Sequence, residues 1–255
     1  MIIFKGGVVP GPYPALFLKE QKALVIADLH IGYESSLKDR GIHIPQNSYP
    51  YMREVVYRLI KETGARTLIM LGDVKHEFGK PSAQEWVEVK DLLSFLSDNG
   101  VEVHVVRGNH DNYIIAILNR MNVPLHDPFM VLDDVLLMHG HKEVEVPEEI
   151  RTVLMGHEHP AVSSRDLSGS RYKFKCFLVG RMGKKRQRLV VLPSMSPLSL
   201  GVGINETPKD ELLSPLLRSV DVDVDSLTPV VVEEQVGVFR FPQVGLMRSI
   251  IKIQD

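Results

Sequence analysis

The sequence predicts an α/β protein, and two observations lead to that prediction. Up to about residue 130, short apolar runs alternate with segments whose apolar residues recur at helical spacing. From about Val131, and throughout the chain beyond residue 160, short apolar runs follow one another with little helical pattern between them, which predicts a β-rich second half. No repeat and no Gly-, Ser- or Pro-rich linker divides the 255 residues, so we expect residues 1–255 to form one domain.

Three apolar runs, at residues 23–27, 67–71 and 101–106, predict buried strands. The segment between the first two runs has apolar residues at helical spacing, namely Met52, Val55, Val56, Leu59 and Ile60. Pro50 lies close to the expected start of this helix, and Gly64 lies just past its end. Three strands separated by two helices predict parallel βαβ units with right-handed crossovers.

A second helix is predicted between the strands at 67–71 and 101–106. Ser82 and Glu85 have the spacing of a capping box, in which each side chain bonds the backbone amide of the other residue. The apolar residues that follow recur at helical spacing and predict a stripe that faces the core: Trp86, Val89, Leu93 and Leu96.

The second half contains further short strand predictions. They lie at residues 131–132, 135–138, 152–155, 173–179 and 189–192. The tail, at 220–232 and 237–253, is also β-like, and we expect strands there. Residues 201–215, with their asparagine and prolines, predict an irregular loop.

Composition and charge exclude several classes of protein. The single cysteine, Cys176, excludes an intramolecular disulfide and any cysteine-cluster zinc or iron–sulfur site. With 30 basic and 32 acidic residues the chain has no global basic field, so nucleic-acid binding would depend on a local patch. Prolines and lysines interrupt the first 20 residues, and no stretch approaches a membrane span, so we expect a soluble, cytoplasmic protein without a membrane partner.

Seven of the ten histidines lie in five short segments that contain or adjoin the C-terminal end of a predicted strand. The segments are Asp28-Leu29-His30, Gly72-Asp73-Val74-Lys75-His76, Gly108-Asn109-His110-Asp111, His139-Gly140-His141 and Gly156-His157-Glu158-His159. In open α/β sheets ligands bind beyond the carboxyl ends of the strands, so we expect these segments to meet at one site. The i, i+2 spacing of the pairs Asp28/His30 and His157/His159 would place both side chains on one side of an extended segment.

The residue types in these segments predict a centre for divalent metal. Carboxylates, imidazoles and a carboxamide oxygen, without thiolates, form a borderline-hard ligand set that fits Mn, Fe or Zn. Seven candidate ligands are too many for one tetrahedral ion, but they suit two ions that share a bridging carboxylate. Two such ions carry more positive charge than two aspartates can neutralise, so the centre keeps a net positive charge. That charge suits an anionic phosphodiester substrate and its more highly charged transition state.

In this order the five segments resemble the motifs D-x-H, G-D-x-x-[DH], G-N-H-[DE], H and G-H-x-H of the calcineurin-like metallophosphoesterases, within residues 28–159. The resemblance implies a four-layer α/β/β/α sandwich. It also implies a first metal held by Asp28, His30, Asp73 and His159. The second metal would be completed by Asn109, His139 and His157, with Asp73 as the bridge.

A closer resemblance is to the ICC-like branch of that superfamily. It is carried by Asp28 to Glu34, Arg40-Gly41-Ile42, Ile44-Pro45 and the histidine form of the second motif, which ends at His76. The branch includes phosphoesterases associated with DNA-repair ligases and helicases. The resemblance therefore implies a phosphodiesterase or single-strand endonuclease that depends on two Mn²⁺ ions. It also implies nucleic acid as substrate and a DNA-repair helicase or ligase as partner.

His110 and Asp111 are the predicted catalytic residues. Neighbouring side chains diverge, so with Asn109 as a ligand His110 is free to hydrogen-bond a phosphoryl oxygen or to protonate the leaving alkoxide. Asp111 is expected to orient His110 and to raise its pKa by stabilising the imidazolium.

Four further residues have open roles. His76 and His141 each lie within three residues of a predicted ligand, so we favour a substrate contact or the orientation of a ligand over a surface position. Tyr33 and Arg40 could contact substrate or pack at the rim of the site. The basic run at residues 181–188 has two interpretations, a solvated hairpin turn or a grip on a phosphate backbone.

Two other functions compete with a nuclease. A small-molecule phosphomonoesterase would use the same chemistry. A partner subunit of a repair helicase or ligase, with weak catalysis, would use the metals mainly for structure. The sequence contains no H-E-x-x-H, G-x-S-x-G or G-x-x-x-x-G-K-[ST] motif that would indicate another hydrolase.

Overall fold

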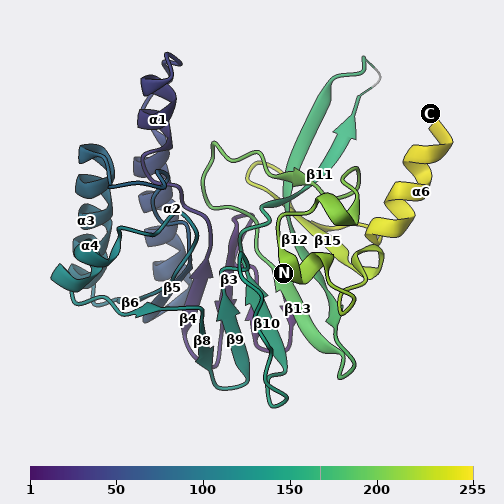
Figure 1. Cartoon of the computed structure of the whole chain (residues 1–255), viewed down its shortest axis with the longest axis horizontal. Coiled ribbons are helices and arrows are strands. Elements are labelled where there is room, and N and C mark those ends of the chain that lie inside the picture. Colours follow the sequence, from purple (N-terminus) through teal and green to yellow (C-terminus); the bar gives the residue numbers. More distant parts are fainter. Residues whose placement is uncertain (167, 255) are drawn as a thin grey trace.

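The computed structural model describes residues 1–166 and 168–254, and it shows two β-sheets packed face to face (Figure 1). The first sheet follows the order of the chain: β1 (Ile2–Phe4), β2 (Gly7–Val8), β3 (Ala15–Leu18), β4 (Ala23–Ile26), β5 (Thr67–Leu71), β6 (Glu102–Val106) and β7 (Leu125–His126). Strands β4 to β7 are parallel, as the βαβ pattern predicts, whereas β1 to β4 are antiparallel.

Helices cover the outer face of the first sheet. They are α2 (Ser48–Thr63), α3 (Ala83–Asp98) and α4 (Ile115–Arg120), whereas α1 (Tyr33–Asp39) lies beyond the end of the sheet and adds no residue to the apolar cluster under these helices (Figure 1). The predicted capping box is confirmed, because Ser82 and Glu85 bond each other's backbone amides at the start of α3. Gly64 ends α2 in the left-handed conformation with φ of 67°, as its position predicts. The apolar faces of α2 and α3 pack on the outward side chains of β4, β5 and β6.

The second sheet has the order β14-β11-β12-β13-β10-β9-β8, with β15 and β16 joined to it through β12. Its strands are β8 (Phe129–Leu132), β9 (Val135–Met138), β10 (Thr152–Met155), β11 (Pro160–Arg165), β12 (Arg171–Met182), β13 (Gln187–Val191), β14 (Val202–Gly203), β15 (Thr228–Glu233) and β16 (Gly237–Arg240). The central strands β9, β10 and β13 are parallel. Their C-terminal ends therefore lie at one edge of this sheet.

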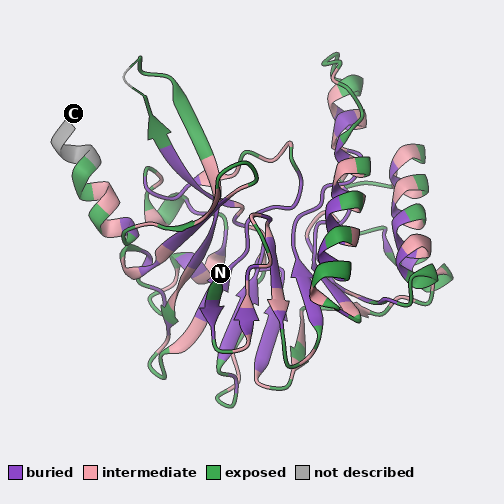
Figure 2. Cartoon of the chain, turned by 180° about the vertical axis from the view of Figure 1, so that it is seen from behind, coloured by how far each residue is buried: buried purple, intermediate pink, exposed green. Residues whose placement is uncertain are grey.

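Alternating side chains divide the apolar core into layers. Ile69 and Leu71 of the first sheet pack against Leu137 and Leu154 of the second, and Figure 2 shows these central strands buried. The outer face of the second sheet is covered by η1 (Lys209–Glu211), α5 (Pro215–Arg218), η2 (Val224–Ser226) and the start of α6 (Val244–Gln254). The order of layers is helices, sheet, sheet and short helices, which confirms the α/β sandwich implied by the motifs.

The strand predictions for the tail are only partly correct. β16 lies inside its predicted range and β15 extends one residue beyond its own, but residues 244–254 form a helix and residues 224–226 a 3₁₀ turn. Strand propensity is a weak preference that packing overrides. Val224 and Val244 are buried against the outer face of the second sheet, where they serve as a cover rather than as further strands.

Several elements were not predicted from the sequence. They are β1, β2, β3, β7, β11, α1, α4 and α5, each of seven residues or fewer. Residues 201–215 are largely irregular, as predicted, apart from β14 and one 3₁₀ turn. No helix in the described part of the chain is long and apolar enough to cross a membrane.

Candidate metal centre

Five loops from the two sheets meet at one edge of the sandwich. They follow β4, β5, β6, β9 and β10 and carry the predicted residues Asp28, His30, Asp73, His76, Asn109, His110, His139, His141, His157 and His159. Within the first sheet, Asp28 N donates to Gly72 O at 3.1 Å. Between the sheets, His157 N donates to Asp28 Oδ2 at 3.0 Å. The convergence expected from the strand-end positions is therefore present.

The backbone that presents these side chains is left-handed rather than extended. Positive φ angles occur at Asp28 (57°), His30 (47°), Asp73 (49°), His157 (67°) and His159 (46°). The prediction of extended segments for the i, i+2 pairs was wrong, although both members of each pair still reach the same cavity. A non-glycine residue in this region costs about 1–3 kcal/mol, and such strain concentrates at functional sites. The surrounding hydrogen bonds hold these residues in that conformation.

Two glycines allow the loops to approach so closely. A Cβ atom on Gly72, whose φ is 77°, would lie 2.7 Å from the Cα atom of Gly108. A Cβ atom on Gly156 would lie 2.8 Å from Asp28 Oδ2 and 2.8 Å from Ala27 Cβ. A side chain at either position would push apart the loops that carry the carboxylates.

The first group of ligand atoms consists of Asp28, His30 and His159, whose atoms lie within 4.8 Å of one another. His159 Nε2 is 3.2 Å from Asp28 Oδ1 and 3.4 Å from His30 Nε2. Ser199 Oγ hydrogen-bonds His159 Nδ1 at 2.7 Å and so fixes the orientation of this ring. This group matches the first metal site implied by the motifs, with Asp73 at its border.

The second group consists of Asp73, His139 and His157. His139 Nε2 lies 3.4 Å from Asp73 Oδ2 and 3.0 Å from the side-chain oxygen of Asn109. Asp73 also approaches the first group, because its Oδ2 lies 3.9 Å from His30 Nε2. Asp73 is therefore placed between the two groups.

The hydrogen bonding around His139 tests whether these residues suit a metal ion. His139 Nδ1 is 2.7 Å from Leu71 O, which can only accept, so this nitrogen carries the proton. In the neutral ring Nε2 then has a free lone pair, and it faces two oxygens that also offer lone pairs. Three acceptors around one point, with the opposite ring nitrogen held by a carbonyl, are what a divalent cation requires.

The pKa shifts of the ligand residues also suit a divalent cation. Burial lowers the pKa of His30 to about 3 and that of His157 to about 4, so both rings are neutral at pH 7 and can donate a lone pair. Burial would also lower the pKa of His139, but the carboxylates of Asp73 and Asp28 raise it to about 9. Burial opposes ionisation of Asp73, yet the neighbouring histidines keep its pKa below the usual value. Without a cation the carboxylates therefore favour a proton on His139 Nε2 at neutral pH, and a bound cation would take the place of that proton.

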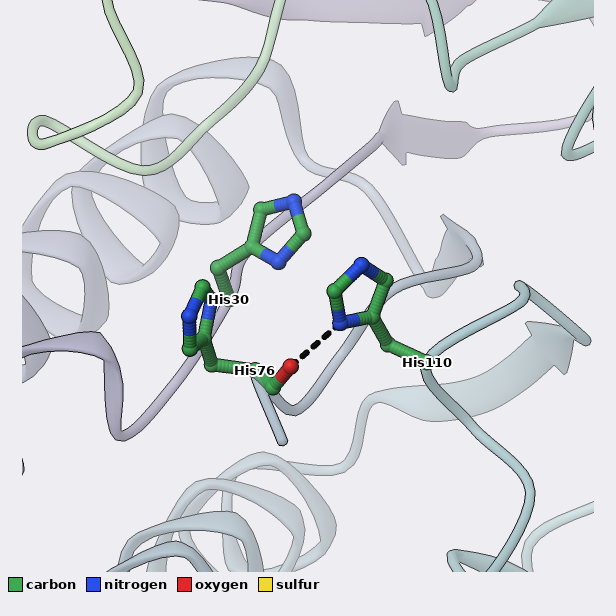
Figure 3. A group of neighbouring side chains, drawn as sticks. All are labelled: His30, His76 and His110. Carbon is green, nitrogen blue, oxygen red and sulfur yellow. Dashed lines mark hydrogen bonds between the residues drawn. The ribbon is translucent and has the colours of Figure 1, made fainter. Parts of the chain in front are cut away.

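The structure corrects the role predicted for Asp111. Its Oδ1 accepts from Val74 N at 3.0 Å and its Oδ2 from Gly108 N at 2.9 Å, so both oxygens serve the backbone of two ligand-bearing loops. The prediction that Asp111 orients the His110 ring was wrong, because the fully buried carboxylate is used by these amides. His110 Nδ1 instead hydrogen-bonds His76 O, as Figure 3 shows.

His110 itself lies at the border of both groups. Its backbone amide donates to Asp73 Oδ1 at 3.0 Å, and its Nε2 lies 3.8 Å from Asp73 Oδ2. Figure 3 shows the rings of His30, His76 and His110 gathered together, and one nitrogen of each lies within 4.8 Å of the others. His76 and His110 are therefore beside the first group, and with His30 they form a third set of possible metal ligands.

Aromatic rings line this side of the site. Tyr33 stacks on His76 with ring centroids 4.0 Å apart, and Phe78 stacks on His110 at 3.7 Å. Phe78 is 57% exposed. Phe78 was not predicted from the sequence, although it lies in the loop directly after the second motif.

The remaining predicted residues lie farther out. His141 is next to the second group, with its ring centroid 5.1 Å from that of His139 and 6.0 Å from that of His157. Burial lowers its pKa to about 4. Arg40 is exposed at the end of α1, and its positive charge contributes to the lowered pKa of His76, of which burial is the main cause.

A loop after β13 supports the site from behind and was not predicted to belong to it. Ser194 Oγ donates to Asp28 O at 2.7 Å, and Ser196 N donates to the same carbonyl at 3.2 Å. The half-buried Lys175 Nζ donates to Ser194 O at 2.8 Å and also bonds Ser196 O. This loop follows the C-terminal end of a parallel strand, so the rule that located the histidines also applies to it.

The basic run at residues 181–188 forms the turn between β12 and β13, as one of its two interpretations predicts. Thr152 of β10 lies beside Arg188, whereas Met155, at the other end of β10, precedes the metal-ligand loop. The run is therefore at the opposite end of the sheet from the candidate metal centre. It does not line the site where a phosphodiester would be cleaved.

A profile of the calcineurin-like phosphoesterase family matches residues 22–224, a range that contains both groups of ligand atoms. The chain belongs to this family. It is accordingly a metal-dependent phosphoesterase, and the family explains why carboxylates and histidines converge at the strand ends.

Solved structures with a similar chain include other phosphoesterases. The nuclease MPE of Pseudomonas putida is 21% identical, with 89% of this chain and 92% of that chain covered and a TM-score of 0.62. Yfce, a phosphoesterase from E. coli, is 19% identical, with 87% and 98% covered and a TM-score of 0.42. The likeness to nuclease MPE shows that this phosphoesterase shares its fold. A comparison with curated proteins found no match.

Proposed function

We propose that this phosphoesterase is a phosphodiesterase that uses two divalent ions, with Mn²⁺ as the favoured metal, and cleaves single-stranded nucleic acid. The position of Asp73 is the observation that carries the dinuclear part of the proposal. Its Oδ2 lies 3.4 Å from His139 Nε2 in one group and 3.9 Å from His30 Nε2 in the other. A carboxylate placed between two sets of ligands is suited to bridge two ions.

The ligand assignment follows from the two groups. Asp28, His30, Asp73 and His159 would hold the first ion, and Asp73, Asn109, His139 and His157 the second. When bound, two divalent ions lower the pKa of water and stabilise negative charge on phosphoryl oxygens. The chain itself supplies two buried aspartates and four histidines, of which His139 is oriented by Leu71 O and His159 by Ser199 Oγ.

His110 is suited to protonate the leaving oxygen of the substrate. Its ring is held by the carbonyl of His76 through Nδ1, and its Nε2 is directed towards the space beside Asp73. In the imidazolium form, Nε2 carries the proton that an alkoxide leaving group needs. Asp111 supports this role indirectly, since it fixes the amide of Gly108 in the same loop.

The aromatic side of the site favours a single-stranded nucleic acid over a small phosphomonoester. Phe78 presents an exposed ring that stacks on His110, directly beside the reacting position. Unpaired bases stack on such rings at about 1–3 kcal/mol per base, whereas bases in a duplex are already stacked and paired. Nuclease MPE, which shares the fold, is itself a nuclease. Membership of the ICC-like branch, with a repair helicase or ligase as partner, is proposed on the motifs quoted above.

Metal-stripped protein, loaded separately with Mn²⁺, Zn²⁺ and Fe²⁺, tests the proposal. Turnover is measured on a single-stranded oligonucleotide, an aryl phosphate diester and an aryl phosphate monoester. We expect Mn²⁺-dependent cleavage of both diesters, its loss in Asp73→Asn, and full activity in the control Asp98→Asn, which alters an exposed aspartate at the end of α3. Rapid turnover of the monoester without oligonucleotide cleavage would instead identify a phosphomonoesterase.

A further inference from the structure

A second cavity lies at the opposite end of the sheets from the metal centre. It has a volume of about 580 Å³ and is lined by the turns β1–β2, β3–β4, β8–β9 and β12–β13 and by residues before β10. Figure 1 shows the β8–β9 and β12–β13 turns at the lower edge of the molecule. The cavity and the metal centre are therefore separated by the length of the parallel strands.

Positive charge dominates the lining of this cavity. Its cationic residues are Lys5, Arg151, Arg181, Lys185, Arg186 and Arg188. The described lining contains three carboxylates, Glu20, Asp134 and Glu148, so the local excess is three positive charges in a chain whose formal net charge is −2. An excess of this kind attracts an anion.

The carboxylates neutralise little of this charge. Arg151 pairs with Asp134 at 3.6 Å, but their side chains are 83% and 47% exposed, and exposed pairs are weak. Lys185 pairs with Glu148, which is 82% exposed. In the described part of the chain, no carboxylate lies within ion-pair distance of the three arginines Arg181, Arg186 and Arg188.

Arg188 is held in place without a neutralising partner. Its guanidinium lies 4.7 Å from the centroid of the Phe4 ring, and its Nη1 donates to Thr152 Oγ1 at 3.3 Å. Partial burial and the positive charge of Arg181 both lower its pKa. Arg181 and Arg188 lie directly opposite each other on β12 and β13. Two guanidinium groups placed side by side in this way repel each other and gain stability when an anion binds to both.

The walls are fixed by hydrogen bonds before any ligand binds. Gln187 Nε2 donates to Pro147 O at 3.2 Å and to Ile150 O at 3.1 Å, which ties the β12–β13 hairpin to the segment before β10. Gly183 N, in the turn itself, donates to Asp221 O at 2.8 Å. A site organised in advance loses less conformational entropy on binding.

We propose that this cavity binds a small oligophosphate anion, such as the phosphate tail of a nucleotide, with Arg181, Arg186 and Arg188 as its main contacts. Guanidinium groups match phosphate oxygens in paired hydrogen bonds. The volume is that of a site for a small molecule. A strand of nucleic acid would need exposed aromatic rings for its bases, whereas Phe4 is buried beneath Arg188. The proposal does not depend on the substrate of the metal centre.

Calorimetric titration with inorganic triphosphate, on metal-stripped protein in EDTA, tests this site. Arg181→Gln and Arg186→Gln alter exposed side chains that line the cavity. Lys184→Gln is the matched control, because Lys184 lies in the same turn but does not line the cavity. We expect the dissociation constant to rise at least tenfold in the double arginine variant and less than twofold in the control.

Three outcomes would overturn the proposal. The first is that triphosphate does not bind the unaltered protein, and the second is that the arginine variants bind it as tightly as the control does. A third outcome is that the arginine variants weaken binding of a single-stranded 15-nucleotide DNA as much as that of triphosphate, which would make the turn a grip on nucleic acid. Cleavage of an aryl phosphate diester by the Mn²⁺-loaded variants is measured in parallel and reports separately on the proposed phosphodiesterase function.

Discussion

Gly156→Ala tests the close packing behind Asp28. The added Cβ would meet Asp28 Oδ2 at 2.8 Å, and Leu71 O, at 3.2 Å, blocks retreat in another direction. Ordinary contact begins at about 3.4 Å, so the carboxylate must move by about 0.6 Å. This exceeds the tolerance of roughly 0.5 Å within which a functional site must be held.

The displacement affects metal binding and stability together. The bond from His157 N to Asp28 Oδ2, now 3.0 Å, has to lengthen or break, and losses of such support weaken metal affinity by about 10–100-fold. Overpacking costs about 1–3 kcal/mol. At roughly 2–4 °C per kcal/mol for a chain of this size, Tm should fall by about 2–12 °C.

Calorimetric titration with Mn²⁺ and thermal unfolding in EDTA measure these two effects. Gly79→Ala is the matched control, because it makes the same change in a loop near the site where a Cβ meets nothing within 4 Å. If Gly156→Ala binds Mn²⁺ and unfolds like Gly79→Ala, the close approach of these loops does not position Asp28, and the reasoning is refuted.

Three further predictions concern residues around the centre. His110→Ala should keep its Mn²⁺ affinity but lose about 100-fold or more in kcat on an oligonucleotide, with a smaller loss on an aryl phosphate diester, whose leaving group needs no proton. Phe78→Ala should raise KM for a single-stranded oligonucleotide about tenfold, since one stacked base contributes about 1–3 kcal/mol, while Phe78→Trp should not. Glu158→Ala should lower the free energy of unfolding in urea by about 1–3 kcal/mol, because it leaves the buried amide of Ser214 and the partly buried amide of Leu213 without their acceptor.

For each of these variants, one outcome would contradict the prediction. Equal losses on both diesters would reject His110 as the proton donor. An unchanged KM in Phe78→Ala would remove the aromatic ring from substrate binding. For Glu158→Ala the control is Glu149→Ala, which alters an exposed glutamate in the loop before β10. Equal free energies of unfolding in the two variants would show that the hydrogen bonds of the Glu158 carboxylate do not stabilise the fold.

The sequence was sufficient to predict the central elements and the meeting of the ligand loops. The apolar runs at 67–71 and 101–106 and the capping box at Ser82 depend on local chemistry that the structure retains. Parallel strands bring their carboxyl ends to one edge, so distant motifs could be placed together without knowledge of side-chain positions. The family match over residues 22–224 confirms the resemblance from which the site was inferred.

Other features depended on contacts between segments distant in the sequence. The partner of Asp111 was mispredicted because the amides of Val74 and Gly108 reach its carboxylate only when two loops pack together. Residues 244–254 form a helix because Val244 packs on the outer face of the second sheet, against the local β-like pattern. The place of Phe78 beside the site follows from its stacking on His110, a contact that is visible only in the tertiary structure.

By itself the sequence determined which atoms this protein offers to a metal: carboxylate and imidazole donors, placed after buried strands. Only the tertiary structure decided where each of those atoms lies relative to the others. The reason is physical. Donor chemistry belongs to a single residue, whereas the position of Asp73 between two groups, and the separation of the basic turn from them, depend on how two sheets pack and in which direction their strands run.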